Sequence, residues 1–366
     1  MSLSYNIPFL SIMLTLVSGI LVPLIRREGG ALRLIRGVQL GVAGLSALLL
    51  VRLSGAGASF SYPMGHIPAP WGNELRAGPL EALLALTFSV VMLLSLSGGA
   101  EDLRRDVRPD RQGWYCLLMQ LLFGALLAMV YTDDLFTGYV FVEIAAVTAC
   151  IAVAAKESGR SVVAAIRYLI FSCLGSGLVL LGIAMLYCIT GQLLFSGLEE
   201  AVARLVQSGE YSLPLVVSAL LMTLGLSIKS AQFPFHAWLP DAHASATTAS
   251  SAILSGLVLK GYLVLLLKLI LRVFGPALIV STYIDDLLFL LGLTGMLFAS
   301  VAALRQEEVK RMIAYSSSAQ ISYIFLALGL GSEAGWTAAC YQILAHAMTK
   351  SMIFVGAGEM IRASGG

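Results

Sequence analysis

Long runs of apolar residues, separated by short polar stretches, follow one another along the whole chain. Each run has about 18 to 25 residues, the length that a helix needs to cross about 30 Å of hydrocarbon. The pattern predicts about eleven transmembrane helices, over residues 5–25, 34–53, 79–99, 114–131, 134–155, 164–190, 212–231, 247–271, 281–303, 312–330 and 335–360. The predicted fold class is therefore an all-α integral membrane protein.

The stretches between these runs predict little structure outside the bilayer. Residues 54–78, rich in Gly and Pro with aromatic residues between them, indicate an external turn or a small hairpin. Residues 100–113 mix both charge signs, which is typical of a solvated cytoplasmic loop. Apolar positions at helical spacing within 191–211 predict a short amphipathic helix at the membrane surface. None of these segments predicts a catalytic pocket.

Composition agrees with an integral membrane protein. The 366 residues are 58% hydrophobic and 12% charged, and the mean hydropathy of +0.88 is outside the range of soluble globular proteins. The first run lacks the basic region and cleavage site of a signal peptide, so we expect it to remain as a helix. The five cysteines stand singly within apolar runs and are predicted to pack there rather than to pair or bind metal.

Lys and Arg are distributed unevenly between alternate loops. Most of them fall on one side of the predicted bundle, namely Arg26, Arg27, Arg33, Arg36, Arg104, Arg105, Arg108, Arg111, Lys156, Arg160, Arg167, Arg305, Lys310, Arg311 and Arg362. The other side has Arg52, Arg76, Arg204, Lys268 and Arg272. By the positive-inside rule the first side is cytoplasmic, which predicts a multi-pass protein of the cell membrane with its N-terminus outside and its C-terminus inside.

The sequence patterns of cofactor sites are missing. The sequence contains no Walker A motif, no GxGxxG between a strand and a helix, no HExxH and no cysteine cluster, so we expect no cofactor, metal or catalytic residue on this chain. His236, Asp241 and His243 have a spacing compatible with metal, but a loop anchored by Trp238 and capped by Asp241 is the simpler interpretation. Any redox chemistry would belong to another subunit.

A lysine beside a predicted helix break is the most informative feature of the chain. Lys229 ends the apolar run 214–229, and SAQFPFHAWLPDAHASATTASS follows it directly. A lysine at membrane depth costs about 2.5 to 3.5 kcal/mol on insertion scales. Pro234 removes a backbone donor and clashes with the preceding turn, so we expect the helix to break there. Broken helices in membranes line packed or hydrated cavities. Lys229 and the helix break together therefore favour an ion path over a lysine that snorkels from a helix end.

Glu143 is the candidate partner of this lysine. It lies about nine residues into the 134–155 helix, with apolar residues on both sides. An unpaired carboxylate in hydrocarbon takes up a proton, whereas a nearby ammonium group such as that of Lys229 keeps it charged. Two interpretations stay open: a structural ion pair, or a titrating pair in which movement of Glu143 loads and unloads Lys229. We favour the second.

Three further titratable residues lie within predicted spans. Lys260 is in the middle of its helix, where snorkelling does not readily reach water, and the Ser and Thr residues upstream of it are more typical of helix packing than of a proton wire. His346 and Lys350 are four residues apart and so share one helix face, and histidine titrates near neutral pH. The predicted proton pathway comprises Glu143, Lys229, Lys260, His346 and Lys350, with the helix break at Pro234.

Three segments resemble a known family. IKSAQFPFHAWLPDAHASATTASSAILSGLVLKGYLVL, KRMIAYSSSAQISYI and LAHAMTKSMIFVGAGE are similar to the signature segments of the antiporter-like membrane subunits. Respiratory complex I, membrane-bound energy-converting hydrogenases and Mrp-type sodium/proton antiporters share this family. The resemblance covers nearly the whole chain from about residue 70, and Gln320 with the segment before the lysine helix is slightly more similar to Mrp-type D subunits and hydrogenase-associated subunits.

The resemblance implies a bundle of about fourteen transmembrane helices, built on two inverted repeats that each contain one broken helix. It implies that Glu143 is the family's helix-five glutamate, Lys229 its broken-helix lysine and Lys260 its central-axis lysine, with His346 and Lys350 on the same polar axis. The family continues for about three more helices, so we expect a C-terminally truncated bundle without the second broken helix. Residues 1–113 would form helices 1 to 3 with the external loop, and 114–366 an incomplete proton-conducting domain.

The function implied is that of an ion-translocating subunit in a multisubunit energy-coupling complex. Such a subunit would move protons, or exchange them for sodium, and its partners would be other membrane subunits and the lipid bilayer rather than nucleic acid. The alternative is a scaffold subunit that packs in such a complex and conducts nothing. A self-contained small-solute transporter is disfavoured, because no substrate pocket is predicted away from the charged residues.

Overall fold

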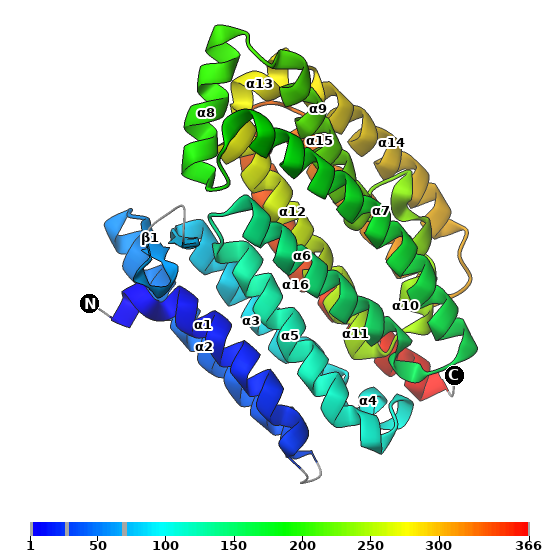
Figure 1. Cartoon of the computed structure of the whole chain (residues 1–366). Coiled ribbons are helices and arrows are strands. Elements are labelled where there is room, and N and C mark those ends of the chain that lie inside the picture. The colour runs from blue at the N-terminus through cyan, green and yellow to red at the C-terminus, as the bar shows by residue number, and fades with distance from the viewer. Residues whose placement is uncertain (1–2, 26–28, 68–71, 365–366) are drawn as a thin grey trace.

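The computed structural model describes residues 3–25, 29–67 and 72–364. Within them the chain is almost entirely helical, as the apolar runs predict (Figure 1). The α-helices are, in chain order, α1 Leu3–Leu21, α2 Gly30–Ala56, α3 Pro79–Gly98, α4 Ala100–Asp106, α5 Gln112–Tyr131, α6 Leu135–Val153, α7 Gly159–Thr190, α8 Phe195–Ser208, α9 Ser212–Lys229, α10 Leu239–Ser245, α11 Thr248–Ile253, α12 Leu259–Lys268, α13 Gly275–Ser281, α14 Ile284–Leu304, α15 Val309–Leu328 and α16 Glu333–Ser364.

Among the described residues, nine helical stretches are long and apolar enough to cross a membrane. They are Ser4–Leu24, Gly30–Gly55, Pro79–Gly98, Pro109–Tyr131, Leu135–Lys156, Gly159–Thr190, Ser212–Lys229, Thr248–Ser281 and Ile284–Leu304. The other two predicted runs, 312–330 and 335–360, fall on α15 and α16, which have 20 and 32 residues. Both exceed or match the length of a membrane crossing but carry more polar side chains. The all-helical membrane fold is therefore confirmed.

Helices that follow one another in the chain pack side by side in alternating directions. The pairs α2 with α3, α5 with α6, α7 with α9 and α14 with α15 are in contact. Short loops join α5 to α6 and α14 to α15, whereas the β1–β2 hairpin lies between α2 and α3 and α8 lies between α7 and α9. In Figure 1, α1 and α2 form one edge of the bundle and α14 the opposite edge, while α16 runs behind α6 and α12. The central helices α5, α11 and α12 are consequently buried on nearly all sides.

The predicted helix break is present between α9 and α10. α9 ends at Lys229, Ala231 adopts a left-handed φ of 57°, and one 3-10 turn, Phe235–Trp238, precedes α10. Gln232 and the backbone of Ala231 bind neighbouring helices: Gln232 Nε2 donates to the carbonyl of Leu291 at 2.6 Å, and Ser318 Oγ donates to that of Ala231 at 3.2 Å. The polar groups of the break thus find partners on α14 and α15, as irregular backbone at membrane depth requires.

The helix that follows α10 is continuous but locally widened. α11, α12 and α13 join through two π-helical segments, Leu254–Val258 and Leu269–Phe274, so that Thr248–Ser281 forms one long stretch. Such π-helical turns occur frequently at functional sites. The first of them ends two residues before Lys260. The hydrophobic pattern predicted this span but not its π-helical turns.

The predicted external hairpin is also present. β1, Phe60–Pro63, pairs antiparallel with β2, Glu74–Ala77, in a register that sets Phe60 opposite Ala77. Residues 68–71 of the predicted segment lie outside the described residues. The predicted amphipathic helix is α8, which buries Phe195, Leu198, Ala201 and Val202 and exposes its charged face.

The prediction of a solvated loop over residues 100–113 is wrong in part. Residues 100–106 form α4, and Asp102 is only 5% exposed. The reason is a tertiary contact that charge patterning does not reveal: Thr248 Oγ1 of α11 donates a hydrogen bond to Asp102 Oδ2 at 2.5 Å. That bond helps to hold α4 against the bundle.

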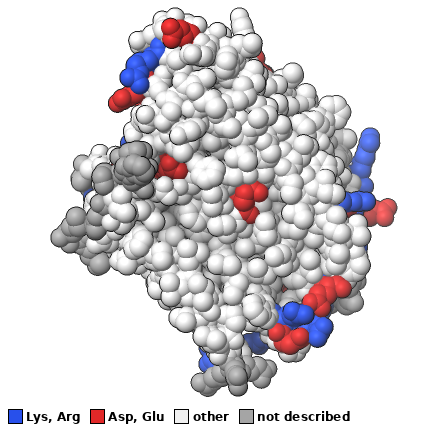
Figure 2. Space-filling view, in the orientation of Figure 1, with Lys and Arg blue, Asp and Glu red and all other residues white. Residues whose placement is uncertain are grey.

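Charged residues gather at one end of the bundle, near α4 and the first turns of α7 and α15. Ion pairs join segments far apart in sequence there: Lys156 with Asp106 at 2.7 Å, Arg160 with Glu308 at 2.9 Å and Arg362 with Glu101 at 2.5 Å. We call this the arginine-rich end. Arg26 and Arg27, which belong to the same predicted side, lie outside the described residues. Figure 2 shows that the face between the two ends is almost free of charge apart from isolated acidic side chains.

Candidate functional site

A buried ion pair joins α6 to α9. Lys229 Nζ lies 3.0 Å from Glu143 Oε1, and it also donates a hydrogen bond to Ser172 Oγ of α7 at 3.0 Å. Ser176, one turn further along α7, donates its hydroxyl hydrogen to the same Glu143 oxygen. Lys229 is 1% exposed. A buried ammonium group is tolerated only when it is paired and hydrogen-bonded, and three helices provide that environment here.

Glycine allows α7 and α9 to approach closely at this point. A Cβ atom on Gly175 would lie 2.8 Å from the carbonyl oxygen of Gly225 and 3.0 Å from Cγ of Lys229. A Cβ atom on Gly225 would lie 2.5 Å from the carbonyl oxygen of Gly175. Small residues at such contacts are typical of helix packing in membranes, where backbones approach directly. The glycine contact between α7 and α9 therefore sets the depth at which Lys229 meets Glu143.

Aromatic side chains enclose the other side of Lys229. Its ammonium nitrogen lies 5.5 Å from the centre of the Tyr262 ring, within the range of a cation–π interaction. The hydroxyl groups of Tyr262 and Tyr168 are 3.4 Å apart, and the Tyr168 ring stacks on Trp238 at 4.4 Å. Trp238 thus anchors the segment after the break, as predicted, and Tyr262 places an aromatic ring between Lys229 and the helix that carries Lys260.

Lys260 is fully buried and turns back onto its own helix. Its Nζ donates a hydrogen bond to the carbonyl of Ser255 at 2.5 Å, within the first π-helical turn. The Ser255 hydroxyl group in turn shares a hydrogen bond of 2.9 Å with Ser317 of α15. Within the described part of the chain, no carboxylate forms an ion pair with Lys260.

His346 and Lys350 lie on the same face of α16 and point into the bundle. Lys350 Nζ donates to Ser316 Oγ at 2.7 Å and to the carbonyl of Ile313 at 3.4 Å. His346 is 3% exposed, and neither of its ring nitrogens has a hydrogen-bond partner among the described residues. Both residues lie within electrostatic range of Lys260. The structure therefore groups the predicted residues into the Glu143–Lys229 pair and a Lys260–His346–Lys350 cluster.

The three residues with possible metal-ligand spacing are directed to different surroundings. Asp241 forms ion pairs with Arg167 and Arg311, and His236 packs against Phe233 and Tyr315. The prediction that Asp241 caps the next helix is wrong: that cap is Thr247, whose hydroxyl oxygen accepts a hydrogen bond from the Ser250 amide at 3.1 Å. Arg167 belongs to α7 and Arg311 to α15. Asp241 therefore links α10 to these two helices and does not cap the start of a helix.

Lys268 is a buried polar residue whose role at a helix end the sequence did not predict. Lys268, fully enclosed, donates hydrogen bonds to the carbonyls of Met129, Val130 and Thr132 at 3.3, 2.5 and 3.0 Å, and so satisfies the C-terminal end of α5. The distribution of Lys and Arg assigns this lysine to the outer side of the bundle, without predicting its burial. Its spacing of eight residues from Lys260, two helical turns, is the signal that it faces the same interior.

A cavity lies away from the pathway residues. It has a volume of about 740 Å³ and is lined by residues of α1, the hairpin segment, α6 and the end of α7, including Met13, Phe136, Asp134 and Tyr187. The sequence predicted no pocket away from the charged residues, so this cavity is an unpredicted feature. The five predicted pathway residues are not part of its described lining.

Comparison with known proteins identifies the family of this arrangement. The model of the NADH:quinone oxidoreductase/Mrp antiporter transmembrane family matches residues 132–365, a range that contains all five predicted pathway residues. The chain belongs to this family. It is also 35% identical over 324 residues to NADH-quinone oxidoreductase subunit N of Desulforudis audaxviator (strain MP104C), covering 86% of this chain and 63% of that protein.

Two solved structures share the fold of this family member. One is the membrane-bound sulfane sulfur reductase, an archaeal respiratory membrane complex, with a TM-score of 0.86, 29% identity and coverage of 97% of this chain and 71% of the matched chain. The other is the Mrp complex from Dietzia sp. DQ12-45-1b, with a TM-score of 0.86, 22% identity and coverage of 97% and 64%. The chain thus spans somewhat less than two thirds of the subunit N relative and of the Mrp chain.

Proposed function

We propose that this chain is an ion-translocating membrane subunit of a multisubunit energy-coupling complex, of the Mrp antiporter, hydrogenase or NADH:quinone oxidoreductase type. The observation that supports the proposal most directly is the contact between Glu143 and Lys229 beside a helix break. Chains of an archaeal respiratory membrane complex and of an Mrp complex share this fold. In this proposal the protons pass along Glu143, Lys229, Lys260, His346 and Lys350.

The physical basis of this function is the making and breaking of the ion pair between Lys229 and Glu143. With Glu143 at 3.0 Å, the ammonium form of Lys229 is stabilised. When the carboxylate moves away, desolvation favours the neutral amine, and the proton leaves towards a neighbouring site. The Lys260–His346–Lys350 cluster, without ion-paired carboxylates among the described residues, supplies neutral nitrogen acceptors for it. The pair then controls proton release, and the cluster receives the proton.

The translocated ion in this proposal is the proton. Four of the five pathway side chains are amines or an imidazole, which bind protons, whereas Na⁺ as a hard cation prefers oxygen ligands as Ca²⁺ and Mg²⁺ do. Sodium exchange by the complex would therefore use other subunits. Any redox chemistry would likewise belong to those partners.

The charge distribution supports a membrane orientation. We assign the arginine-rich end to the cytoplasm of a cell membrane and the β1–β2 hairpin with α8 to the outside, which places the N-terminus outside. Residues 1–113 then flank the path, and residues 114–366 contain it. Other membrane subunits would contact the uncharged lateral face shown in Figure 2.

Proton transport by the complete complex in proteoliposomes tests this function. Lys229→Met and Lys260→Met remove the amines while keeping apolar side chains of similar length, and we expect each to lower transport by about tenfold or more. Arg204→Met, on the exposed face of α8, is the matched charge-removal control and should transport normally. Normal transport with both lysine variants in an assembled complex would instead indicate a scaffold subunit.

A further inference from the structure

Three buried hydroxyl groups, on α1, α2 and α5, lack a hydrogen-bond partner among the residues that the structure describes. They belong to Ser11, Ser46 and Tyr131, and each of these residues is 0% exposed. Buried polar groups are nearly always hydrogen-bonded, either to protein or to ordered water. The predicted pathway residues lie on α6, α9, α12 and α16. The proposed proton pathway therefore does not use these hydroxyl groups.

The two serines do not use the acceptor that their own helices offer. A serine or threonine within a helix can donate to a carbonyl one turn before it. On α1, Thr15 Oγ1 donates in this way to the carbonyl of Ile12 at 2.7 Å, and Ser18 Oγ donates to that of Thr15 at 2.9 Å. Ser11 and Ser46 do not form this bond. Their hydroxyl groups are consequently directed away from the carbonyls of their own helices.

A layer of hydrogen-bonded side chains fixes how α1, α2 and α5 are aligned. Gln120 Nε2 of α5 donates to Ser18 Oγ of α1 at 2.8 Å, and Gln39 Nε2 of α2 donates to Gln120 Oε1 at 3.3 Å. Both glutamines are 0% exposed. Each of the three helices contacts the other two. This glutamine layer is a common level from which positions on the three helices can be compared.

The two serines lie at the same distance from the glutamine layer. Ser11 precedes Ser18 by seven residues on α1, and Ser46 follows Gln39 by seven residues on α2. Seven residues are two helical turns, or about 10 Å, and return a side chain to the same helix face. The β1–β2 hairpin follows α2 and contacts the start of α1, so both displacements are towards the hairpin. The two hydroxyl groups therefore lie at one level.

Tyr131 brings a third hydroxyl group towards this level from α5. It follows Gln120 by eleven residues, three turns of α5, and so shares the face of that glutamine. Its side chain leans back towards the start of the helix, as long side chains in helices do. The hydroxyl groups of Tyr131 and Ser46 are close enough to interact, yet no direct hydrogen bond of normal geometry joins them. Polar groups in this arrangement are commonly bridged by water.

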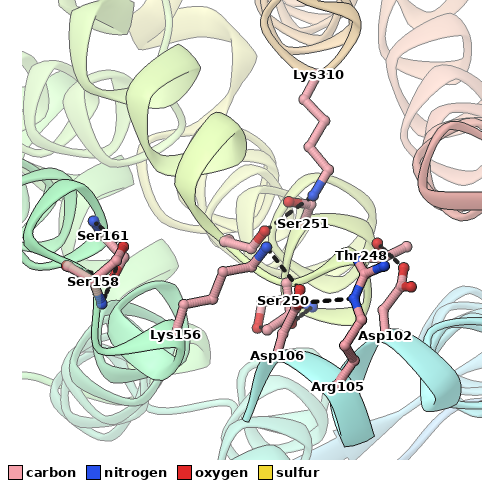
Figure 3. A network of polar contacts seen from close by, with 12 residues as sticks. Asp102, Arg105, Asp106, Lys156, Ser158, Ser161, Thr248, Ser250, Ser251 and Lys310 are labelled. Carbon is pink, nitrogen blue, oxygen red and sulfur yellow. Dashed lines mark hydrogen bonds and ion pairs between the residues drawn. The ribbon is translucent and has the colours of Figure 1, made fainter. Parts of the chain in front are cut away.

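A serine and a tyrosine near the start of α5 behave differently. Figure 3 shows Ser250 of α11 within a network of polar side chains. Its hydroxyl group shares a direct hydrogen bond of 2.9 Å with that of Tyr115 on α5. The bundle thus pairs hydroxyl groups directly where its helices allow it, whereas Ser46 and Tyr131 stay apart.

We propose that α1, α2 and α5 enclose an ordered water molecule that is bound by the hydroxyl groups of Ser11, Ser46 and Tyr131. Buried waters typically make about three hydrogen bonds to groups that are otherwise unsatisfied. Each hydroxyl group can donate or accept, so the three together complete the water's hydrogen bonds. The water joins the edge helices α1 and α2 to α5. Such polar links matter in a membrane, where lipid provides no hydrophobic driving force between helices.

Hydroxyl-radical footprinting of the assembled complex tests for this water directly. X-ray pulses generate radicals from water in place, and mass spectrometry then identifies the side chains that bound water has oxidised. We expect Tyr131 to be labelled although it is 0% exposed, and its labelling to decrease in Ser46→Ala. Phe325 of α15 is equally buried and should stay unlabelled. An unlabelled Tyr131 in the wild-type complex would overturn the proposal, whatever the stability of the variants.

Removal of single hydroxyl groups gives a second test, in which the sign of the change decides. Ser46→Ala and Tyr131→Phe each remove one hydrogen bond to the water, so we expect the midpoint of thermal unfolding to fall by about 1 to 3 °C. Without a bound water, the same substitutions remove an unsatisfied buried group, and the midpoint would stay the same or rise. Ser300→Ala, on the exposed face of α14, is the control and should leave the midpoint unchanged. Midpoints at or above that of the wild type for both variants would contradict the proposal. Labelling of the wild-type complex decides the case if a variant does not assemble.

Discussion

Lys229 and Glu143 form an ion pair in which the two partners differ sharply in accessibility. Their side chains are 0% and 33% exposed, although the charged atoms are 3.0 Å apart. The lysine is enclosed by α7, α9 and Tyr262, whereas the carboxylate belongs to a partly open face of α6. In the proposed complex, a neighbouring subunit would act on Glu143 directly and on Lys229 only through it.

Glu143→Gln tests this dependence. The amide keeps the size of the side chain and an oxygen that can accept the hydrogen bond from Ser176, but it removes the charge that stabilises the Lys229 ammonium group. We expect the complex to assemble and proton transport in proteoliposomes to fall by about tenfold or more. Glu199→Gln, on the exposed face of α8, is the matched control. Equal transport by both variants would be inconsistent with a titrating pair.

Gly175→Ala tests whether the close approach of α7 and α9 is required. The added methyl group would lie 2.8 Å from the Gly225 carbonyl oxygen, so the helices must separate, at a cost of about 1 to 3 kcal/mol. We expect a lower midpoint of thermal unfolding of the purified complex and slower transport. Gly177→Ala, two residues along α7, meets no atom within 4 Å and should behave as the wild type. Equal midpoints for the two variants would contradict this account.

Gly358→Ala tests the contact between α16 and α11. Its methyl group would lie 2.4 Å from both Oγ1 and Cγ2 of Thr248, the residue that donates to Asp102. We expect a loss of about 1 to 3 kcal/mol of stability, seen as a lower thermal midpoint. Gly356→Ala on the same helix has no atom within 4 Å of its added carbon and serves as the control. A normal midpoint for Gly358→Ala would show that α11 and α16 separate at little cost.

Lys268→Met separates stability from transport. The substitution leaves the carbonyls of Met129, Val130 and Thr132 without the ammonium donor that now satisfies them. Each unsatisfied buried group costs about 1 to 3 kcal/mol, so the thermal midpoint should fall clearly. Transport per assembled complex should stay close to that of the wild type, because Lys268 is not part of the pathway. A selective loss of transport with an unchanged midpoint would assign Lys268 to the pathway instead.

The sequence predicted the elements that depend on local pattern. Apolar runs of membrane length gave the helices, the Gly- and Pro-rich segment gave the β1–β2 hairpin, and Pro234 gave the break after Lys229. The depth of Glu143 and Lys229 in their runs was enough to expect their contact. In each case the residues of one continuous segment are sufficient to determine its local structure.

The features that the sequence did not predict depend on contacts between distant segments. α4 is held against the bundle by a contact between Asp102 and Thr248, 146 residues away. His243 is buried because α16 covers it with Phe354, and Lys268 is buried because it reaches the end of α5. The π-helical turn before Lys260 has no signal in hydrophobic periodicity, which does not distinguish α from π geometry over one turn.

In the proposed mechanism, the glycine contact between α7 and α9 also bears on the timescale of proton release. There is no room for a methyl group at Gly175, so the backbone of α9, which carries Lys229, packs directly against the backbone of α7. Opening of the ion pair then falls to the side chains, above all to the partly exposed Glu143. Rotamer changes of exposed side chains take on the order of nanoseconds or less, whereas collective helix movements take microseconds to milliseconds. The first event in each transport cycle would thus be among the fastest motions of the protein, and the slow step would lie in whatever the neighbouring subunit does to Glu143.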